Sequence, residues 1–548
     1  MIGLTANAAV STESCSNAPL LVNVVASNDI APAVQSVASS FNNQNVTSGG
    51  RCVQVQVDQA DSATEAGQID GQARSQGPAV DAWIPDSSLW VDVARTYAPG
   101  AQAVQRTGTS IARSPLMLVA TKAVATQTGI FAEPPTWNLL LPSADGGPPA
   151  SLGLTVDLPD PASSATGLAS LTEVSRLLGT GPAERTGLTA LVRGVQTTQS
   201  VNSPSLLTQF AQLPGKSVTV ATEQAVLAYD KTSPKVPLAA QYASSSTQSL
   251  GTPELDYPYV LTTAQPAAAR AATKFGDYLQ TPYAQSVMRY DGFRSANGQL
   301  DVMPKSADLA GQPLQLATAI SPKEAATNLQ AWQQLGLGFR ELILADVSPA
   351  MDQPSGDGSM NVLTMLDQTA SGGLGLYPDS TQMGVWTMGE SPSASDPYQQ
   401  LVSMGALSAD FGMIVRRTQL QDIIATLKPS ANGTLAMHTA ILDAYEQMTK
   451  SYLAGYENNV IVLTSGVDSA RGDISLSSLL AQIHHLANPA KPVGIVILMF
   501  GTQGNFGALQ QIAAAAPGGT SFHVTSPAQI GQIFIDNMSQ RLCSPSCG

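Results

Sequence analysis

The sequence is poor in charged and aromatic residues, in histidine and in cysteine. Charged residues make up 12% of the 548 positions and aromatic residues 5%, with four histidines and four cysteines. So few histidines argue against a histidine-based catalytic centre or zinc site, and so few aromatic residues against a sugar-stacking platform. The net charge of −14 argues against nucleic acid, whose phosphates it would repel. The chain has no run of apolar residues long enough to predict a membrane span.

The four cysteines form two local pairs, Cys15 with Cys52 and Cys543 with Cys547. Cys15 precedes one strand-like run and Cys52 opens another, so a bridge is feasible if these strands are parallel neighbours. A proline between Cys543 and Cys547 favours a turn that could close a small ring. Redox or metal-binding pairs are the competing interpretation, but the Cys-x-x-Cys spacing and a set of four ligands are both missing. We therefore expect two structural disulfides and an oxidising compartment.

The first ten residues contain no basic region and no long apolar segment, so no intact signal peptide is predicted. With the low charge and the expected disulfides, this predicts an extracellular or cell-envelope-attached protein whose signal or anchor segment is absent from this chain. Membrane contact is expected only through such a missing N-terminal anchor.

The first 300 residues alternate between strand-like and helix-like segments. Residues 20–27 are strand-like, residues 30–41 carry apolar side chains at helical spacing, and residues 52–57 alternate with period two. Further strands are predicted at 79–85 and 114–121. This repeated pattern predicts a mainly parallel sheet with helices on both faces.

The order of these segments resembles the two-lobed bacterial extracellular solute-binding proteins. The resemblance covers residues 15–315 and rests also on Trp83-Ile-Pro-Asp-Ser-Ser88, Asp157-Leu-Pro-Asp-Pro161, Thr222-Glu-Gln-Ala225 and Gly292-Phe-Arg294. It implies a periplasmic-binding-protein-like (type II) module. Lobe 1 is expected at about 15–113 plus 262–315, and lobe 2 at about 114–261.

Proteins of this type capture ligands between their lobes, so polar residues at the strand-to-helix corners are candidate ligand contacts. Helix N-termini present free N–H groups that suit anions, although each of these corners would also serve as an N-cap. The acidic residues among them disfavour an anion, and a small polar or cationic ligand, or none, is equally compatible. The candidates are Ser27, Asn28, Asp86, Ser87, Ser88, Asp157, Ser163, Ser164, Thr222 and Glu223.

A second α/β series begins near residue 325, after a junction expected at 305–325. Residues 341–345, 459–464 and 493–500 are near-continuous apolar runs, as buried parallel strands require. A helix is predicted from Pro527 to about Leu542. The series ends in a cysteine-containing tail, residues 543–548.

Three loops of this second half resemble the metal-binding loops of a von Willebrand factor type A (VWA) domain. They are Asp346-Val-Ser348-Pro-Ala350, Asn432-Gly-Thr434 and Leu463-Thr-Ser465-Gly466. The resemblance covers residues 325–542 and implies a Rossmann-like doubly wound α/β fold. The family's first loop reads Asp-x-Ser-x-Ser. In this family the three loops hold a divalent cation, and a carboxylate of the partner can complete the coordination of that cation. The aligned metal positions are Asp346, Ser348, Thr434 and Ser465.

The aligned metal site is degenerate. Ala350 stands where the family has a hydroxyl, and Ser465 where it has an aspartate. Hard divalent cations need oxygen ligands and enough negative charge to offset their dehydration. The pattern therefore predicts either a weak, partner-dependent site for Mg²⁺, Mn²⁺ or Ca²⁺, or a relic whose polar residues cap loops and helices. No cofactor is otherwise expected.

The chain contains no complete catalytic motif, so we expect a protein that is not an enzyme. The pairing of modules resembles actinomycete proteins with substrate-binding and VWA domains. It implies an extracellular recognition protein whose VWA face binds a protein or a cell-envelope component. The solute-binding-like module would act as a sensor or a second contact surface. The alternative is a receptor that delivers a small polar ligand or an oxyanion to an ABC transporter.

Overall fold

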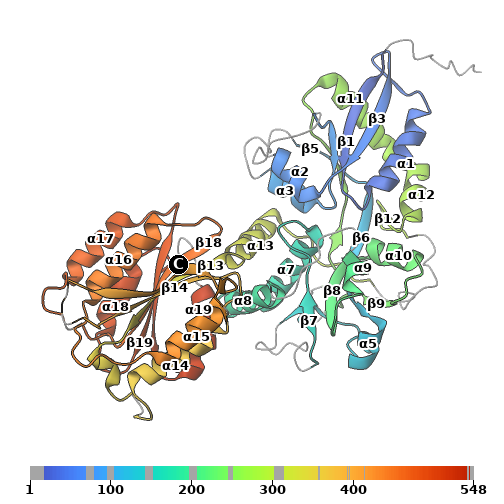
Figure 1. Ribbon diagram of the computed structural model, residues 1–548. Helices are drawn as coiled ribbons and strands as arrows, with labels where there is room; N and C mark the ends of the chain where they lie inside the picture. Colours follow the sequence, from blue (N-terminus) through green and yellow to red (C-terminus); the bar gives the residue numbers. More distant parts are fainter. Residues whose placement is uncertain are drawn as a thin grey trace, which may run out of the picture. The chain divides into compact units, whose positions relative to one another are not determined.

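The chain forms two compact units, Met1–Trp332 and Gln333–Gly548 (Figure 1). The computed structural model describes residues 18–69, 79–95, 104–141, 152–196, 206–244, 251–300, 314–355, 358–391, 393, 395–412, 414–468, 470–539 and 542. Within these ranges no helix is both long and apolar enough to cross a membrane.

Lobe 1 of the first unit is built on a six-stranded sheet in the order β2-β3-β1-β4-β11-β5. The strands are β1 (Leu20–Ala26), β2 (Thr47–Ser48), β3 (Arg51–Gln59), β4 (Ala82–Ile84), β5 (Gln105–Ser110) and β11 (Pro258–Leu261). The central strand β1 is parallel to β3 and β4, whereas β11 is antiparallel to both of its neighbours. This departure from the predicted parallel order arises because β11 enters the sheet on its way back from lobe 2.

Helices α1 (Ala31–Asn42), α2 (Ser62–Ile69), α3 (Ser88–Ala94), α11 (Pro266–Leu279) and α12 (Pro282–Tyr290) complete lobe 1. The apolar stripe of α1 is buried, as its spacing predicts, with Val34, Val37 and Phe41 at most 1% exposed. Phe41 packs edge to face against Phe275 of α11, with 5.4 Å between ring centroids. Helices α1 and α11 thus pack against each other and against the sheet.

Lobe 2 has a sheet in the order β10-β6-β8-β7, with β9 and β12 also paired to β6. The strands are β6 (Ala112–Thr121), β7 (Thr155–Asp157), β8 (Ser217–Thr222), β9 (Leu238–Gln241), β10 (Glu254–Leu255) and β12 (Arg294–Ser295). The helices are α5 (Lys122–Thr128), η1 (Trp137–Leu140), α7 (Ala165–Leu178), α8 (Pro182–Gln196), α9 (Leu206–Phe210) and α10 (Glu223–Lys231).

The described chain crosses between the lobes after β5, after β10 and after α12. At the second crossing Tyr257 has a φ of +35°, a conformation that is rare for a residue other than glycine. Its backbone carbonyl accepts a bond from the Ile111 amide at 3.0 Å. Its ring packs against Phe293, with centroids 5.1 Å apart. Tyr257 therefore ties the three crossings together.

The second unit is a single six-stranded sheet in the order β15-β14-β13-β18-β19-β20. Neighbours from β14 to β20 are parallel, and β15 is antiparallel to β14. The strands are β13 (Gly338–Asp346), β14 (Gln382–Met388), β15 (Tyr398–Ala406), β18 (Tyr456–Thr464), β19 (Val493–Phe500) and β20 (Thr520–Val524), with a separate hairpin of β16 (Asp410–Phe411) and β17 (Ile414–Val415).

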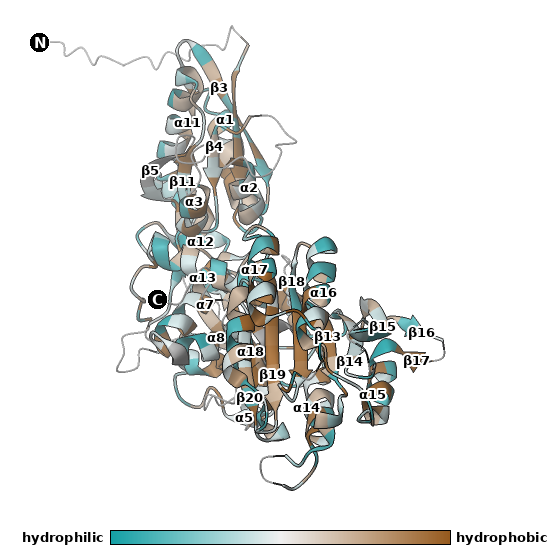
Figure 2. Cartoon of the chain, turned by 90° about the vertical axis from the view of Figure 1, so that its left-hand side faces the viewer, coloured by the Kyte–Doolittle hydropathy of each residue, from teal (hydrophilic) through white to brown (hydrophobic). Residues whose placement is uncertain are grey.

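Helices cover both faces of this sheet. One face packs against α16 (Met437–Lys450), α17 (Leu476–Leu486) and α18 (Phe506–Ala515). The other packs against α14 (Val362–Leu374), α15 (Arg416–Thr426) and α19 (Ile530–Ser539), with short η3 (Pro349–Asp352) and η4 (Pro527–Gln529). Every residue of β19 is buried, and the strand is brown in Figure 2. The predicted doubly wound fold is confirmed, because an all-apolar strand requires cover on both faces.

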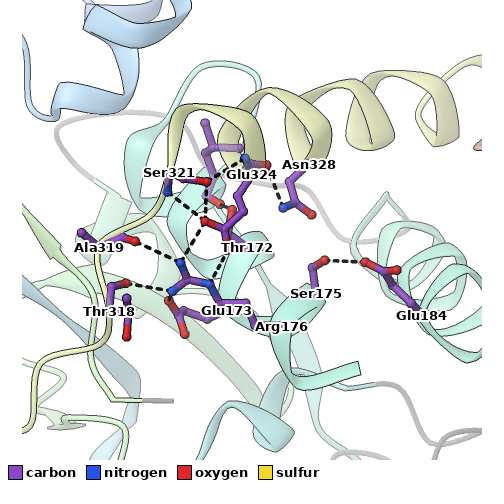
Figure 3. A network of polar contacts seen from close by, with 11 residues as sticks. Thr172, Glu173, Ser175, Arg176, Glu184, Thr318, Ala319, Ser321, Glu324 and Asn328 are labelled. Carbon is purple, nitrogen blue, oxygen red and sulfur yellow. Dashed lines mark hydrogen bonds and ion pairs between the residues drawn. The ribbon is translucent and has the colours of Figure 1, made fainter. Parts of the chain in front are cut away.

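Helix α13 (Pro322–Leu335) extends across the boundary between the units. Its first turn is held on lobe 2 by the Arg176 guanidinium of α7, which lies between Glu173 of the same helix and Glu324 (Figure 3). The Arg176–Glu173 and Arg176–Glu324 ion pairs measure 2.8 and 2.9 Å. Arg176 also donates to the carbonyls of Thr318 and Ala319. The segment that leaves the first unit is therefore fastened to lobe 2.

Candidate functional site

A cavity of about 430 Å³ lies between the two lobes of the first unit. Lobe 1 contributes the ends of β1, β3 and β4, and lobe 2 contributes the starts of α7 and α10 and one side of α9. This is the position where open α/β sheets bind ligands. Six of the ten predicted contact residues line it: Ser27, Asn28, Asp86, Ser163, Ser164 and Thr222.

Two of these residues cap helices, as the sequence also allowed. Ser164 Oγ accepts from the Gly167 amide at 3.3 Å, and Thr222 Oγ1 accepts from the Ala225 amide at 3.1 Å. Both functions are compatible, because a capping hydroxyl at a cavity wall can still present its oxygen or proton to a ligand.

Ser87 and Ser88 line a separate cavity of about 190 Å³ beside the same crossing. Ser87 Oγ caps α3 by accepting from the Leu89 amide at 3.2 Å. The Ser88 amide donates to Asp256 Oδ1 at 2.7 Å. These two residues hold the start of α3 against the second crossing.

Asp157 and Glu223 do not line either cavity. Glu223 is fully buried, and its carboxylate pairs with the Arg294 guanidinium at 2.7 Å and accepts from the Tyr242 hydroxyl. Asp157 is 2% exposed, and within the described ranges neither carboxylate oxygen has a hydrogen-bond partner. Burial raises the pKa of Asp157 to about 6.

The inter-lobe cavity contains carboxylates that we did not predict, Asp29 and Asp61. Asp29 Oδ1 accepts from Ser27 Oγ at 2.6 Å and from the Ile30 amide at 2.9 Å. Its Oδ2 accepts from the Tyr257 hydroxyl at 2.5 Å. The position of Asp29 right after Asn28 at a strand end could have revealed it, and the same rule applied to β3 would have suggested Asp61. The Tyr257 contact has no sequence signal, because it depends on how the chain crosses between lobes.

Asp86 is the most perturbed carboxyl group of the cavity. One of its oxygens, Oδ1, is buried and has no hydrogen-bond partner in the described part of the chain. Burial and then the nearby Asp29 raise its pKa to about 8, with a smaller contribution from Asp61. The cavity therefore holds a carboxyl group with one buried oxygen that no donor of the described residues contacts.

In the second unit, three of the four predicted metal positions meet at the carboxyl ends of β13 and β18. Asp346 is fully buried, and its Oδ1 accepts from the Ser348 amide at 2.8 Å. Its Oδ2 accepts from Thr464 Oγ1 at 2.9 Å and from the Ser465 amide and hydroxyl, both at 3.0 Å. Ser348 Oγ, also buried, has no partner among the described residues.

Thr434, the fourth predicted position, is bound elsewhere. Its amide donates to the Ser391 carbonyl at 2.8 Å, and its hydroxyl donates to the same oxygen at 3.4 Å. The carboxylate that a cation would need is thus used inside the protein, and Ser465 supplies a donor where a metal would need an acceptor. The residues present do not fit a divalent cation.

A hollow of about 340 Å³ adjoins this site. Its lining includes Ala350, Ser465 and Gln503 and contains no charged residue of the described chain. The strand-end face thus offers a neutral recess of apolar and hydrogen-bonding groups.

Asp468, three residues after Ser465, has its Oδ2 3.8 Å from His438 Nδ1. His438, Asp468 and Asp473 come close together, but Asp473 accepts from the amides of His438 and Thr439 at the start of α16. His438 Nδ1 lies 2.8 Å from the Ile474 carbonyl. This cluster therefore serves to cap a helix.

Cys52 is disulfide-bonded, and β1 and β3 are parallel neighbours, as the predicted pairing requires. Cys15, Cys543 and Cys547 lie outside the described residues. The two pairings and the tail at 543–548 therefore stay predictions.

Two family models match the chain, one for each unit. Residues 22–294 match the bacterial extracellular solute-binding protein family, and residues 342–535 match the von Willebrand factor type A domain. Two curated relatives from Mycobacterium tuberculosis, one from strain CDC 1551 / Oshkosh and one from strain ATCC 25618 / H37Rv, are described as uncharacterized proteins. Each is 26% identical over 533 residues, which is 91% of this chain and 73% of the relative.

Solved structures with similar folds include proteins of both kinds. They are the sulfate-binding protein SubI from Mycobacterium tuberculosis H37Rv (19% identity, TM-score 0.36, 50% of this chain and 87% of that one), iron-bound HitA from Pseudomonas aeruginosa (14%, 0.43, 58% and 100%) and a von Willebrand factor type A protein from Catenulispora acidiphila (15%, 0.29, 38% and 43%). By its two family matches, the chain carries a bacterial extracellular solute-binding domain followed by a von Willebrand factor type A domain.

Proposed function

We propose that this chain is a non-catalytic extracellular recognition protein. Its first unit captures a small polar solute between the lobes, and its second unit binds a protein or cell-envelope component through the strand-end face. The extracellular character of the solute-binding family supports a location outside the cell or in the cell envelope.

The inter-lobe cavity carries this proposal. Its volume of about 430 Å³ falls within the range of small-molecule sites. Polar groups from both lobes converge on it, with Ser27, Asn28 and Asp86 on one side and Ser163, Ser164 and Thr222 on the other. A solute that contacts both walls would stabilise the closed arrangement of the lobes, because its contacts with both walls form only there.

The strand-end face of the second unit supports a partner site that works without metal. Asp346 is held by hydrogen bonds from Ser348, Thr464 and Ser465 in the place of a cation. The hollow beside Ser465 is uncharged in the described chain, so it suits an apolar or amide-bearing group of a partner. The recess would add shape recognition to whatever surface surrounds it.

A cavity-filling variant tests the capture of a solute. Ser163→Trp places a bulky ring at the cavity wall and should abolish binding, whereas Thr273→Trp on the exposed side of α11 should leave it intact. The assay is a thermal-shift screen of the unmodified chain against polar solutes, followed by calorimetry on each positive compound. Solutes that stabilise the unmodified chain and Ser163→Trp equally would refute capture in this cavity.

The same screen separates this proposal from the ABC-transporter alternative. A transport receptor needs a solute and a permease, and its binding to other proteins should depend on that solute. A recognition protein should still bind an envelope partner when Ser163→Trp blocks the cavity. Partner binding that disappears in this variant, while the second unit stays folded, would favour the receptor.

A further inference from the structure

The charge of the inter-lobe cavity is of one sign. The acidic side chains in its lining are Asp29, Asp61 and Asp86, and the described lining contains no lysine, arginine or histidine. In a partly enclosed site, charges of one sign interact more strongly than in water, because the protein walls screen them less. The cavity therefore repels anions and attracts cations.

The helix N-termini at the cavity, which could bind an anion, are already occupied by groups of the chain. Asp29 accepts from the Ile30 amide at the start of α1, at 2.9 Å. Asp61 accepts from the Thr64 amide in α2, also at 2.9 Å. Ser164 and Thr222 cap α7 and α10 in the same way. An incoming anion would have to displace these groups and would then face carboxylates.

Asp86 supplies the unused acceptor. Its amide donates to Ser62 Oγ at 3.1 Å, but its carboxylate oxygen Oδ1 is buried and unpartnered in the described chain. A buried acceptor without a donor costs free energy that a ligand N–H group would recover. Asp29, in contrast, has both oxygens engaged, by Ser27, Ile30 and Tyr257.

A single metal ion does not fit this arrangement. Within the described ranges, the only three-residue set close enough to hold a metal is His438, Asp468 and Asp473 of the second unit. The three cavity carboxylates do not converge to that degree. Beside the polar groups of lobe 2, the opposite wall has an apolar part on α9 and α10, formed by Leu206, Leu207, Ala225, Ala228 and Tyr229. A ligand with a charged end and an apolar body matches both walls.

We propose that the inter-lobe cavity binds a small organic cation, an ammonium or guanidinium compound with an apolar part, and that Asp86 is its ion partner. This rests on the proposed capture of a solute between the lobes. The cationic group donates to Asp86 Oδ1, near Asp29 and Asp61, and the apolar part lies against α9 and α10.

Proton release should accompany binding. Burial and Asp29 raise the pKa of Asp86 to about 8, so the ligand-free cavity holds a proton on this group at neutral pH. The titratable groups around it are Asp29 before α1, Asp61 before α2 and Tyr257 at the crossing. A cation replaces the proton, so affinity should rise by up to about tenfold per pH unit until pH reaches about 8.

The test compares three classes of probe on the full chain. Agmatine, benzylamine and butylammonium are the cations, benzyl alcohol and butanol the neutral analogues, and sulfate, phosphate and molybdate the anions. Calorimetry at pH 8 should detect binding of at least one cation and of no anion. Asp86→Asn should weaken that binding by about 30-fold or more and remove its pH dependence, because a buried charge partner is lost.

Asp58→Asn is the matched control, since Asp58 is an exposed carboxylate of β3 that does not line the cavity. Circular dichroism establishes that both variants are folded. Binding of anions or neutral probes instead of cations would overturn the cation proposal and leave solute capture intact. Equal cation binding by Asp86→Asn and the unmodified chain would also overturn it. If no probe of any class bound, both the cation proposal and, after the wider solute screen, solute capture would fail.

Discussion

At the scale of single residues, Ser465 stands where the VWA pattern has an aspartate. This replacement determines whether the second unit can bind a divalent cation. In the VWA pattern an acidic residue at this place shares a cation with Asp346. Here the serine hydroxyl and amide donate directly to Asp346 Oδ2, both at 3.0 Å. A buried carboxylate with several donors is stable without a cation.

We expect the unmodified chain to give no binding heat with Mg²⁺, Mn²⁺ or Ca²⁺ at millimolar concentration. The double substitution Ala350→Ser with Ser465→Asp restores the missing hydroxyl and carboxylate, and should create a site because two buried carboxylates need a cation between them. Calorimetry on both proteins, with the single variant Ala350→Ser as control, measures this. A cation that binds the unmodified chain and loses that binding in Asp346→Asn would contradict the prediction.

A second residue-scale consequence concerns Asp157, which is 2% exposed with both oxygens unpartnered in the described chain. Burial raises its pKa from 3.8 to about 6. Between these values the unfolded chain loses the proton while the folded chain keeps it. The contribution of Asp157 to the free energy of unfolding therefore falls as pH rises from about 4 to about 6, and stays low above that.

Asp157→Asn should remove this pH-dependent loss. The free energy of unfolding of the variant, minus that of the unmodified chain, should increase by about 2 kcal/mol from pH 4 to pH 7.5. Each pKa unit corresponds to about 1.4 kcal/mol, and relaxation of the folded chain around the charge reduces the total. Urea unfolding at both pH values measures the difference, with the exposed Asp58→Asn as control. A constant difference at the two pH values would show that Asp157 ionises in the folded chain as it does in water.

At the scale of elements, the start of α13 is held by a reciprocal pair of bonds. The Ser321 amide donates to Glu324 Oε2 at 2.9 Å, and the Glu324 amide donates to Ser321 Oγ at 3.3 Å. This is a capping box, and it satisfies donors at the helix start. The hydrogen bond from Arg176 lowers the pKa of Glu324 to about 2, although burial acts in the opposite direction.

Glu324→Ala removes both the cap and the ion pair with Arg176. Glu324 is 39% exposed, so solvent screening limits the ion pair to a small share of an expected local loss of about 1 kcal/mol. Amide exchange over residues 318–328 should then be roughly fivefold faster, as measured by hydrogen–deuterium exchange. Lys323→Ala, an exposed substitution on the same turn, is the control. Unchanged exchange in Glu324→Ala would mean that α13 is held by other contacts.

At the scale of the whole molecule, the sequence was most informative where a pattern is local. The apolar run of β19 and the helical spacing of α1 correspond to the observed elements, because burial on both faces or on one stripe leaves a direct trace. The edge strand β15 has no such apolar pattern in the sequence, because only Val402 of its nine residues is buried. Strands at a sheet edge face water on most sides and need no apolar pattern.

The inter-lobe cavity likewise has some features that a local sequence pattern predicts and others that it does not. The corners that carry Ser27, Asp86 and Ser164 could be located, since they follow a strand or start a helix. Which corners face each other depends on the three lobe crossings, and no residue pattern encodes that geometry. Glu223 shows the limit: it follows a strand in the same way, yet Arg294, from a segment 71 residues away, binds it in the interior.

The segment through which the chain leaves the first unit, residues 315–324, is attached to lobe 2. Thr252 is bonded to Gln315 and Ala317, and Arg176 to Thr318, Ala319 and Glu324, so residues 315–324 belong physically to lobe 2. If a captured solute closes the lobes, as we propose, the base of α13 would move together with lobe 2 and relative to lobe 1. On the proposed capture of a solute, this displacement would be the signal that leaves the first unit, without any contact between the solute and residues outside the two lobes.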